Sequence, residues 1–536
     1  MRAVSCQLLV AGCALLTEAA ASPAANLNNT SECRKTKVAI LGAGVAGITA
    51  AQTLSNASIH DFLIVDRNDY IGGRVAHTTF GSKPDGTPYT IELGANWVQG
   101  LGTEGGPENP IWTLAKKYGI NNTYSNYSSI LTYDTNGDAD FGDLFDEMDG
   151  AYSTAEQDAG YILTQNLQDT SMRAGFSLAD WKPKKDMRAQ ALEWWYWDFE
   201  TAWPPEQCGF LYGITGYNLT FYQWSDENNF VWDQRGFNTF VEGEAGEFLE
   251  ENDPRLILET IVKTISYGPQ GVIVQLEGGD CIEAEYAIAT FSLGVLQNDV
   301  VAFDPPLPRW KREAIEQFQM GTYTKIFFQF PEAFWDLDTQ FFLYADDNIR
   351  GYYPVWQSLS GPGFLEGSNI IFVTVVDGQS YRVEQQSEEQ TKEEALAVLR
   401  AMFPDKEIPE PIHFSYPKWS TEEWAYGSYS NWPVGMTLEK HQNLRSNVDR
   451  LWFAGEATSA QYYGFLHGAW FEGRDAAMRI AGLINPGRTP GECNNVTTTG
   501  CGNMEAYKVL HGTTELEEYN VQNGWSASSF LTYGYE

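Results

Sequence analysis

Apolar residues near the start of the chain form two short continuous runs with a helical pattern between them. Residues 38–41 and 62–65 are uninterrupted hydrophobic runs, the pattern of strands buried on both faces of a parallel sheet. Between the two runs, Ala50, Ala51 and Leu54 recur at the spacing of one helix face. This order predicts a parallel strand–helix–strand unit, and therefore a fold of the α/β class.

Further elements are indicated far from this unit. Residues 451–454 predict a short buried strand, and a helix is expected over 472–483. Strands are also indicated at 325–330 and 369–376, whereas residues 101–232 are rich in helical and Trp/Tyr-containing segments. These patterns predict a mixed α and β architecture without internal repeats.

The composition adds a strong charge imbalance to this picture. The chain has 536 residues, of which 43% are hydrophobic, and this is enough to bury a large core. Its 71 acidic residues outnumber the 34 basic ones and give a formal net charge of −37. Such a field repels phosphate backbones, which excludes nucleic acid as a partner. The same charge attracts cations, although solubility in an acidic exterior is an alternative reason for it.

The first 21 residues have the organisation of a secretory signal peptide. Arg2 precedes an apolar run at 8–16, and small residues at 19–22 offer a cleavage site. The run is too short to cross a bilayer, so we expect a secreted protein without a membrane anchor. N-glycosylation sequons fit that compartment, and they begin at Asn28, Asn29, Asn56, Asn121, Asn126, Asn218 and Asn495.

Five cysteines remain once the leader is removed: Cys33, Cys208, Cys281, Cys493 and Cys501. Cys493 and Cys501 bracket a short Asn/Thr-rich loop and are the predicted disulfide. The odd count leaves at least one thiol free or paired with another chain. There is no Cys-x-x-Cys pair and the six histidines are scattered, so no metal site is predicted.

A glycine-rich turn follows the first predicted strand. Gly42, Gly44 and Gly47 have GxGxxG spacing at the start of the predicted helix, and Asp66 ends the second strand. Such glycines allow a tight bend, close approach to a pyrophosphate and close helix–strand packing. The helix N-terminus attracts phosphate, and the acid accepts hydrogen bonds from ribose. Strand, glycines, helix, strand and acid in this order predict a dinucleotide site.

Three later motifs are similar to those of flavoenzymes. Gly-Gly-Arg at 72–74 resembles the extended nucleotide motif of FAD oxidoreductases, in which the arginine contacts FAD phosphate. Gly-Ala-Asn-Trp at 94–97 looks like a flavin-side loop of the same group. The strand and Gly-Glu of 450–458 resemble a segment that ends beside the ribityl and pyrophosphate groups. The cofactor contacts that these motifs imply are Arg74, Ala95, Trp97 and Glu456.

Together with residues 233–236, 323–325 and 427–435, these motifs resemble the flavin-containing amine oxidases, most closely the secreted polyamine oxidases of plant and fungal type. The resemblance covers about residues 36–485. It implies a Rossmann-like FAD-binding domain interleaved with a substrate-binding domain of sheet plus helices. It also adds two cofactor contacts, Val262 and Trp419.

The resemblance further implies that both domains are discontinuous. The FAD-binding domain is expected at 36–100, 233–320 and 440–485, and the substrate-binding domain at 101–232 and 321–439. Residues 486–536 are expected to form a C-terminal tail. The oligomeric state stays open.

Three residues are similar to catalytic positions of the family. Lys325 aligns with a lysine that reaches flavin N5 through a water, and a surface lysine is the alternative. Tyr429 and Phe465 align with two aromatic residues that flank the amine, with Tyr and Phe exchanged relative to the plant-type pattern, and ordinary core aromatics are the alternative. Ser428 stands where monoamine oxidases carry the cysteine that bonds FAD, so FAD is expected to be noncovalent.

Two residues bear on the substrate. Glu200 aligns with an acid of the polyamine tunnel, and a solvated helix-end glutamate is the alternative. Gln99 stands where the family has a second acid, which removes a charge and weakens the inference of a polyamine substrate.

The leading hypothesis is a secreted, FAD-dependent polyamine oxidase. Such an enzyme oxidises spermine- or spermidine-type amines at the carbon beside nitrogen to an imine, which is hydrolysed to aldehyde and amine, while O₂ is reduced to H₂O₂. An L-amino-acid oxidase of the same fold, or a flavin-binding protein without turnover, are the alternatives. The former needs an arginine to hold the substrate carboxylate, and no motif singles one out.

Overall fold

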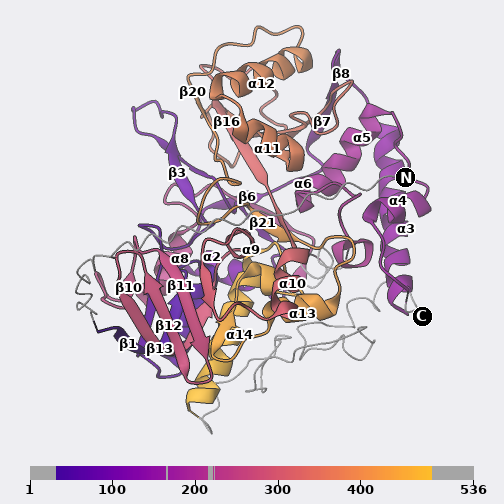
Figure 1. The fold of residues 1–536 in the computed structure, drawn as a ribbon. Helices are drawn as coiled ribbons and strands as arrows, with labels where there is room; N and C mark the ends of the chain where they lie inside the picture. The colour runs from indigo at the N-terminus through magenta and orange to yellow at the C-terminus, as the bar shows by residue number, and fades with distance from the viewer. Residues whose placement is uncertain (1–31, 165–166, 215–220, 222–223, 486–536) are drawn as a thin grey trace, which may run out of the picture.

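A computed structural model describes residues 32–164, 167–214, 221 and 224–485 (Figure 1). The predicted leader, the C-terminal tail, the proposed Cys493–Cys501 bond and the sequons at Asn28, Asn29, Asn218 and Asn495 lie outside these ranges.

One sheet combines three distant parts of the chain. Its strand order is β10-β2-β1-β13-β12-β11-β14, with β22 also paired to β13. β1 runs parallel to both β2 and β13, as expected for the strand–helix–strand unit. The strands are β1 (Arg34–Leu41), β2 (Phe62–Val65), β10 (Leu256–Ile257), β11 (Val262–Gly268), β12 (Gly271–Leu276), β13 (Cys281–Ala289), β14 (Ala302–Asp304) and β22 (Leu451–Phe453).

Helices α1 (Val45–Asn56) and α14 (Leu466–Ile484) pack together beside this sheet. A Cβ on Gly473 would lie 2.1 Å from the Ala46 carbonyl oxygen, so a glycine at this position lets the two helices approach closely. The predicted start of α14 at residue 472 is wrong, because the helix begins six residues earlier. Glycines at 468 and 473 weaken its helical pattern, and close packing outweighs their poor helix propensity.

A second sheet has the order β20-β16-β19-β18-β17-β7-β8. The predicted strand at 325–330 begins two residues earlier, and the one at 369–376 begins one later because Asn369 has a φ of 53°. The strands are β7 (Ile130–Asp134), β8 (Gly137–Asp138), β16 (Tyr323–Gln329), β17 (Phe341–Ala345), β18 (Val355–Ser358), β19 (Ile370–Val376) and β20 (His413–Ser415).

The two faces of this second sheet meet different elements. Alternate residues such as Ile326 and Phe328 pack against α11 and α12, which Figure 1 shows beside the upper strands. Lys325 and Phe327 point to the other face. α11 is Asp377–Gln385 and α12 is Glu388–Met402.

A helical layer lies beside this sheet, where α5 contacts β17, and α5 also contributes to the core. It consists of α3 (Gly142–Thr164), α4 (Met172–Leu178), α5 (Met187–Glu193), the π-helix η1 (Trp194–Asp198) and α6 (Phe199–Thr201). The remaining strands are β3 (His77–Phe80), β4 (Tyr89–Glu92), β5 (Trp97–Gln99), β6 (Asn122–Tyr124), β9 (Asn228–Val231), β15 (Gln319–Gly321) and β21 (Tyr429–Asn431). The remaining helices are α2 (Pro110–Lys117), α8 (Thr239–Gly246), α9 (Leu293–Gln297), α10 (Arg309–Gln317), α13 (Leu438–Arg445) and the 3₁₀ turn η2 (Glu456–Thr458).

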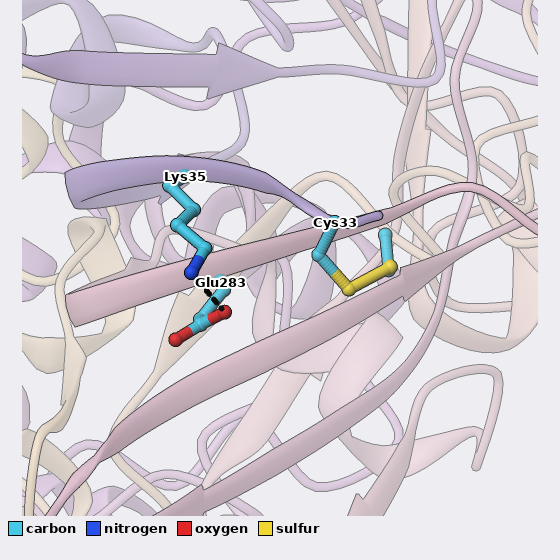
Figure 2. The surroundings of a disulfide bond; sticks show 4 residues. Cys33, Lys35 and Glu283 are labelled. Carbon is cyan, nitrogen blue, oxygen red and sulfur yellow. Dashed lines mark ion pairs between the residues drawn. A yellow bond between two sulfur atoms is a disulfide. The ribbon is translucent and has the colours of Figure 1, made fainter. Parts of the chain in front are cut away.

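A disulfide that the sequence did not predict joins Cys33 to Cys281 (Figure 2). It ties the start of β1 to the start of β13, next to the ion pair between Lys35 and Glu283 at 3.6 Å. Cys208 is a free, buried thiol. Within the described ranges, no helix is long and apolar enough to cross a membrane, and no group of His, Cys and acidic side chains could hold a metal ion.

Candidate functional site

A cavity of about 320 Å³ lies where the first sheet meets the second. It begins at the glycine-rich turn after β1 and reaches the aromatic residues of β16, α6 and β21. Most of the predicted site residues line it: Gly42, Gly44, Asp66, Arg74, Ala95, Trp97, Gln99, Glu200, Val262, Trp419, Tyr429, Glu456 and Phe465. Gly47 and Lys325 do not, and both lie behind its wall.

The glycine-rich turn forms an open cradle at one end of the cavity. A Cβ on Gly44 would meet nothing closer than the Gly73 Cα atom at 4.0 Å, so the two glycine backbones leave room for a ligand. A Cβ on Gly47 would lie 1.9 Å from the Gly42 carbonyl oxygen. Gly47 therefore packs against the backbone of the turn and does not line the cavity. No described side chain caps the N-terminus of α1, so its N–H groups are available to a phosphate.

Asp66 lies at the end of β2 beside this cradle. Its carboxylate accepts hydrogen bonds from the N–H groups of Ala43 at 2.7 Å and Asn68 at 2.8 Å, which fix its orientation. Burial raises the pKa of this carboxyl, and the two backbone hydrogen bonds oppose that shift. The oxygens keep lone pairs that can accept from ribose hydroxyls.

Arg74 and Glu456 connect the two ends of the chain at the cavity. The Arg74 Nη1 atom donates to Glu456 Oε1 at 2.8 Å and to the Ser428 carbonyl oxygen at 2.9 Å. Glu456 also accepts from the N–H groups of Ser430 and Gly464. Residues separated by almost four hundred positions thus form one polar cluster at the expected phosphate and ribityl end.

These features fit an FAD molecule. The cradle, the uncapped helix, the ribose acid and the arginine occur in the order that a dinucleotide needs, and the cavity continues beyond them into an aromatic chamber. Ser428, at the position where a cysteine would bond FAD, accepts a hydrogen bond from the backbone N–H of Tyr323 and donates one to the carbonyl oxygen of the same residue.

Lys325 is a buried lysine, which removes the surface alternative. Its Nζ atom donates to the Gly94 oxygen at 2.9 Å and to Asn96 Oδ1 at 2.8 Å, and both of these residues line the cavity. Burial lowers the pKa of the ammonium group, and the carboxylate of Glu92 opposes this shift. The proposed contact through water to the flavin stays a prediction.

Tyr429 and Phe465, the two aromatic residues predicted to flank the amine, both line the aromatic chamber. The Tyr429 ring lies 6.0 Å from the Tyr323 ring, and its hydroxyl donates to the Glu200 carbonyl oxygen at 2.9 Å. Gly464, next to Phe465, lies against Tyr429, because a Cβ there would be 3.5 Å from its Cδ2 atom. Tyr429 and Phe465 both line the cavity, so neither is an ordinary residue of a closed core.

Glu200 provides an acid in this chamber. Burial raises the pKa of its carboxyl to about 7, and a hydrogen bond with Tyr127 opposes that shift. Glu200 lines the cavity and its carboxyl interacts with Tyr127, Tyr323 and Tyr429, which line it too, so it is not a solvated helix-end glutamate. Gln99, at the end of β5, lines the same cavity.

Sequence reasoning missed several residues of the site. Tyr323 could have been found from its place two positions before Lys325, because alternate strand residues share a face. Glu92 lies on β4, two residues before the flavin-side loop, and burial raises the pKa of its carboxyl opposite Lys325. No sequence signal indicates Tyr127, which reaches the chamber from the loop before β7.

Fold and site together define an oxidoreductase with a dinucleotide cradle that opens into an aromatic chamber, and comparison with known proteins gives the family. The family model for flavin containing amine oxidoreductase matches residues 45–481. Polyamine oxidase 1 of Zea mays is 38% identical, with 82% of this chain and 89% of that protein covered. Polyamine oxidase 7 of Oryza sativa subsp. japonica is 36% identical, with 82% and 93% covered.

A solved structure of putrescine oxidase bound to putrescine has a TM-score of 0.66 at 18% identity, covers 84% of this chain and 100% of the other, and supports the fold alone. The chain belongs to the flavin-containing amine oxidoreductases. It is an FAD-dependent amine oxidase.

Proposed function

We propose that the protein is a secreted polyamine oxidase with noncovalent FAD, acting on spermine- or spermidine-type amines. The observation that carries the proposal is the Glu200 carboxyl in an aromatic chamber continuous with the cofactor cradle. A polycation needs an anion away from the oxidised nitrogen, because a buried charge is costly unless it is paired. The relatives named polyamine oxidases support the same substrate class.

When bound, FAD takes a hydride equivalent from the carbon beside nitrogen and passes the electrons to O₂. This chain's residues hold the amine for that step. Tyr429 and Phe465 provide the walls, Glu200 binds a second ammonium group, and Lys325 holds a proton behind Asn96 at the expected flavin edge.

An amino-acid substrate is disfavoured by the arginines of the cavity. Within the described ranges, the arginines that line it are Arg67 and Arg74. Arg67 pairs with Glu423 at 2.6 Å and Arg74 with Glu456, both at the cofactor end. Neither is placed to bind a carboxylate in the aromatic chamber.

Secretion is supported by the leader, by the Cys33–Cys281 disulfide and by exposed sequon residues at Asn56, Asn121 and Asn126. Recovery of the glycosylated, processed protein from culture medium tests this part. Retention of the full-length chain inside the cell would contradict it.

Peroxide release from the purified protein tests the substrate. We expect turnover of spermidine and spermine, weaker turnover of monoamines and none of amino acids. Turnover of amino acids without turnover of polyamines would contradict the proposal. Flavin that spermidine fails to bleach without oxygen would indicate binding alone.

A further inference from the structure

The chamber acid Glu200 follows a rare element of the fold. Residues 194–198 form the π-helix η1, in which the Phe199 N–H donates to the carbonyl oxygen of Trp194, five residues earlier. A π turn accommodates one more residue than an α turn, is uncommon, and occurs often at functional sites. η1 connects α5 to the three-residue α6 that carries Phe199 and Glu200 into the chamber.

The extra residue decides where Glu200 points. Glu193 and Glu200 are seven residues apart, about two turns of a regular α-helix, so in such a helix they would share one face. The π turn rotates the residues that follow it by on the order of 100° relative to that arrangement. Glu193 is therefore buried away from the cavity, at 1% exposure, while Glu200 lines it.

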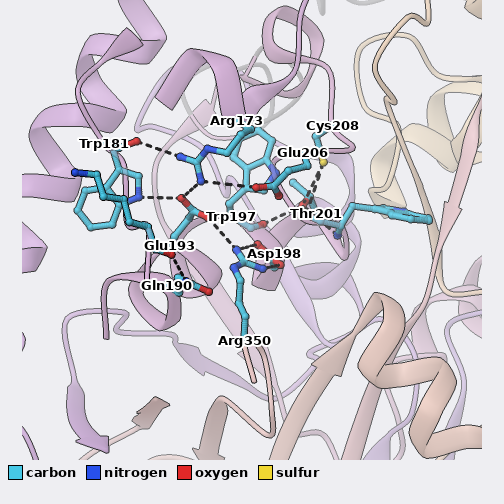
Figure 3. A network of polar contacts seen from close by, with 12 residues as sticks. Arg173, Trp181, Gln190, Glu193, Trp197, Asp198, Thr201, Glu206, Cys208 and Arg350 are labelled. Carbon is cyan, nitrogen blue, oxygen red and sulfur yellow. Dashed lines mark hydrogen bonds and ion pairs between the residues drawn. The ribbon is translucent and has the colours of Figure 1, made fainter. Parts of the chain in front are cut away.

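Two arginines hold the carboxylates at the two ends of η1, from opposite sides (Figure 3). Arg350 donates to Asp198 at 2.5 and 2.8 Å and to Glu193 at 3.1 Å. Glu193 also accepts from Arg173 at 2.5 Å and from the Trp181 indole at 2.9 Å. Arg350 comes from the loop between β17 and β18 of the second sheet.

The pairing pattern matches the π pitch. Glu193 and Asp198 are five residues apart, and the five-residue hydrogen-bonded turn brings them close enough for one guanidinium to bridge both. In a regular α-helix, residues five apart point in clearly different directions. The ion pairs therefore favour the π turn over the α-helical alternative.

We propose that the buried cluster of Arg350, Asp198, Glu193 and Arg173 is a positioning device for substrate selectivity. By holding η1 in its π pitch, it directs the Glu200 carboxyl into the chamber, where it binds the distal ammonium group of a polycationic amine. This rests on the proposed role of Glu200. A buried ion-pair cluster adds little net stability compared with apolar packing, so positioning is a sufficient reason for it.

The experiment compares Asp198→Asn with the wild type in the full-length holoenzyme. The amide keeps the shape of the side chain but removes the charge, and Arg350 keeps Glu193 as a partner, so folding is preserved. We expect KM for spermidine to rise about tenfold, the loss of one charge-assisted contact, with KM for butylamine and kcat changed less than twofold. Arg350→Lys cannot bridge the two carboxylates as a guanidinium does, so KM for spermidine should rise. The rise should be smaller than for Asp198→Asn, because lysine keeps the positive charge.

Two controls separate positioning from general stability. Glu394→Gln breaks an ion pair with Arg382 on the far face of the same sheet and should leave the KM ratio of the two amines unchanged. In a Glu200→Gln background, Asp198→Asn should cause no further rise in KM for spermidine. An equal rise in both backgrounds, or a lower melting temperature with an unchanged KM ratio, would overturn the inference.

A crystal structure of Asp198→Asn gives a readout that needs no turnover. We expect an α-helical 194–201 segment with Glu200 turned from the chamber, and a retained π turn with Glu200 in place would overturn the inference. If the wild-type protein oxidises no polyamine, the proposed function fails, whereas this structural result still decides whether the cluster sets the pitch.

Discussion

Lys325 is the residue whose chemistry depends most on its surroundings. Its ammonium group is buried between two oxygens of the cavity wall. Lys325→Met removes the charge at similar length, and we expect flavin reduction or reoxidation to slow by about 10²-fold while FAD stays bound. Stopped-flow measurement of both half-reactions checks this, with the flavin spectrum as the control for binding. Unchanged rates in both half-reactions would show that the lysine has another role.

Glu92 tunes that lysine. Burial lowers the pKa of Lys325, and the negative charge of Glu92 partly restores it, with Asp233 the further acid near Glu92. Glu92→Gln removes the stabilising charge, so the pKa of Lys325 should fall further. The ammonium form is then lost at lower pH, and the alkaline limb of the pH profile of the Lys325-dependent half-reaction should move to lower pH. A shift to higher pH would contradict this assignment.

Gln99 tests the charge pattern of the chamber. Gln99→Glu adds a carboxylate to the wall that already contains Glu200, and we expect KM for spermidine to fall about tenfold through one more charge-assisted contact. Steady-state kinetics with spermidine and butylamine check the effect, which should be larger for the polycation. An unaltered affinity would place Gln99 outside the substrate path.

At the scale of elements, the disulfide joins two neighbouring parallel strands across 248 positions of sequence. Replacing Cys33 and Cys281 together by Ser should lower the free energy of unfolding by about 2–4 kcal/mol, because the unfolded chain gains freedom. Chemical denaturation measures this. Reductant should destabilise the wild type by more than it destabilises the double variant, which keeps Cys493 and Cys501. An equal effect of reductant on both proteins would indicate another cause.

The same scale shows what the sequence could predict. The elements around the glycine-rich turn are predictable because buried parallel strands and the GxGxxG spacing are strong local signals, and the predicted starts of β16 and β19 agree with the structure within two residues. The start of α14 is not predictable from the sequence pattern, because Gly468 and Gly473 are poor helix formers. Both are needed for close packing, against Tyr462 and Ala46, and only the folded structure shows these contacts. No sequence pattern within residues 194–198 indicates the π-helix η1, because the ion pairs that favour it come from Arg350 in the distant loop between β17 and β18.

The site was predicted unevenly for the same reason. Motif residues such as Gly44 and Glu456 were expected to meet at the cofactor, and they line one cavity. The electrostatic effect of Glu92 on Lys325 is not predictable from the sequence, because only tertiary folding brings the two charges near each other. The pairing of Cys33 with Cys281 is also not predictable from the sequence, because cysteine connectivity cannot be deduced from spacing.

For the whole molecule, the net charge of −37 should influence encounter with substrate. A negative field attracts polycations over a distance that shortens as salt is added. We expect kcat/KM for spermidine to fall about tenfold from low to physiological ionic strength, and that for butylamine to fall much less. Kinetics over a salt series check this, and equal salt dependence for both amines would contradict a steering role.

The order in which the first sheet is assembled has a consequence for biosynthesis. β22 joins β13 only after some 450 residues have been made, and Glu456, which holds Arg74, follows it directly. A growing chain that contains the whole glycine-rich turn still lacks one side of its cofactor site. Loading with FAD is therefore a late event of biosynthesis, because the cofactor site is complete only once the segment around Glu456 has been made and has joined the sheet.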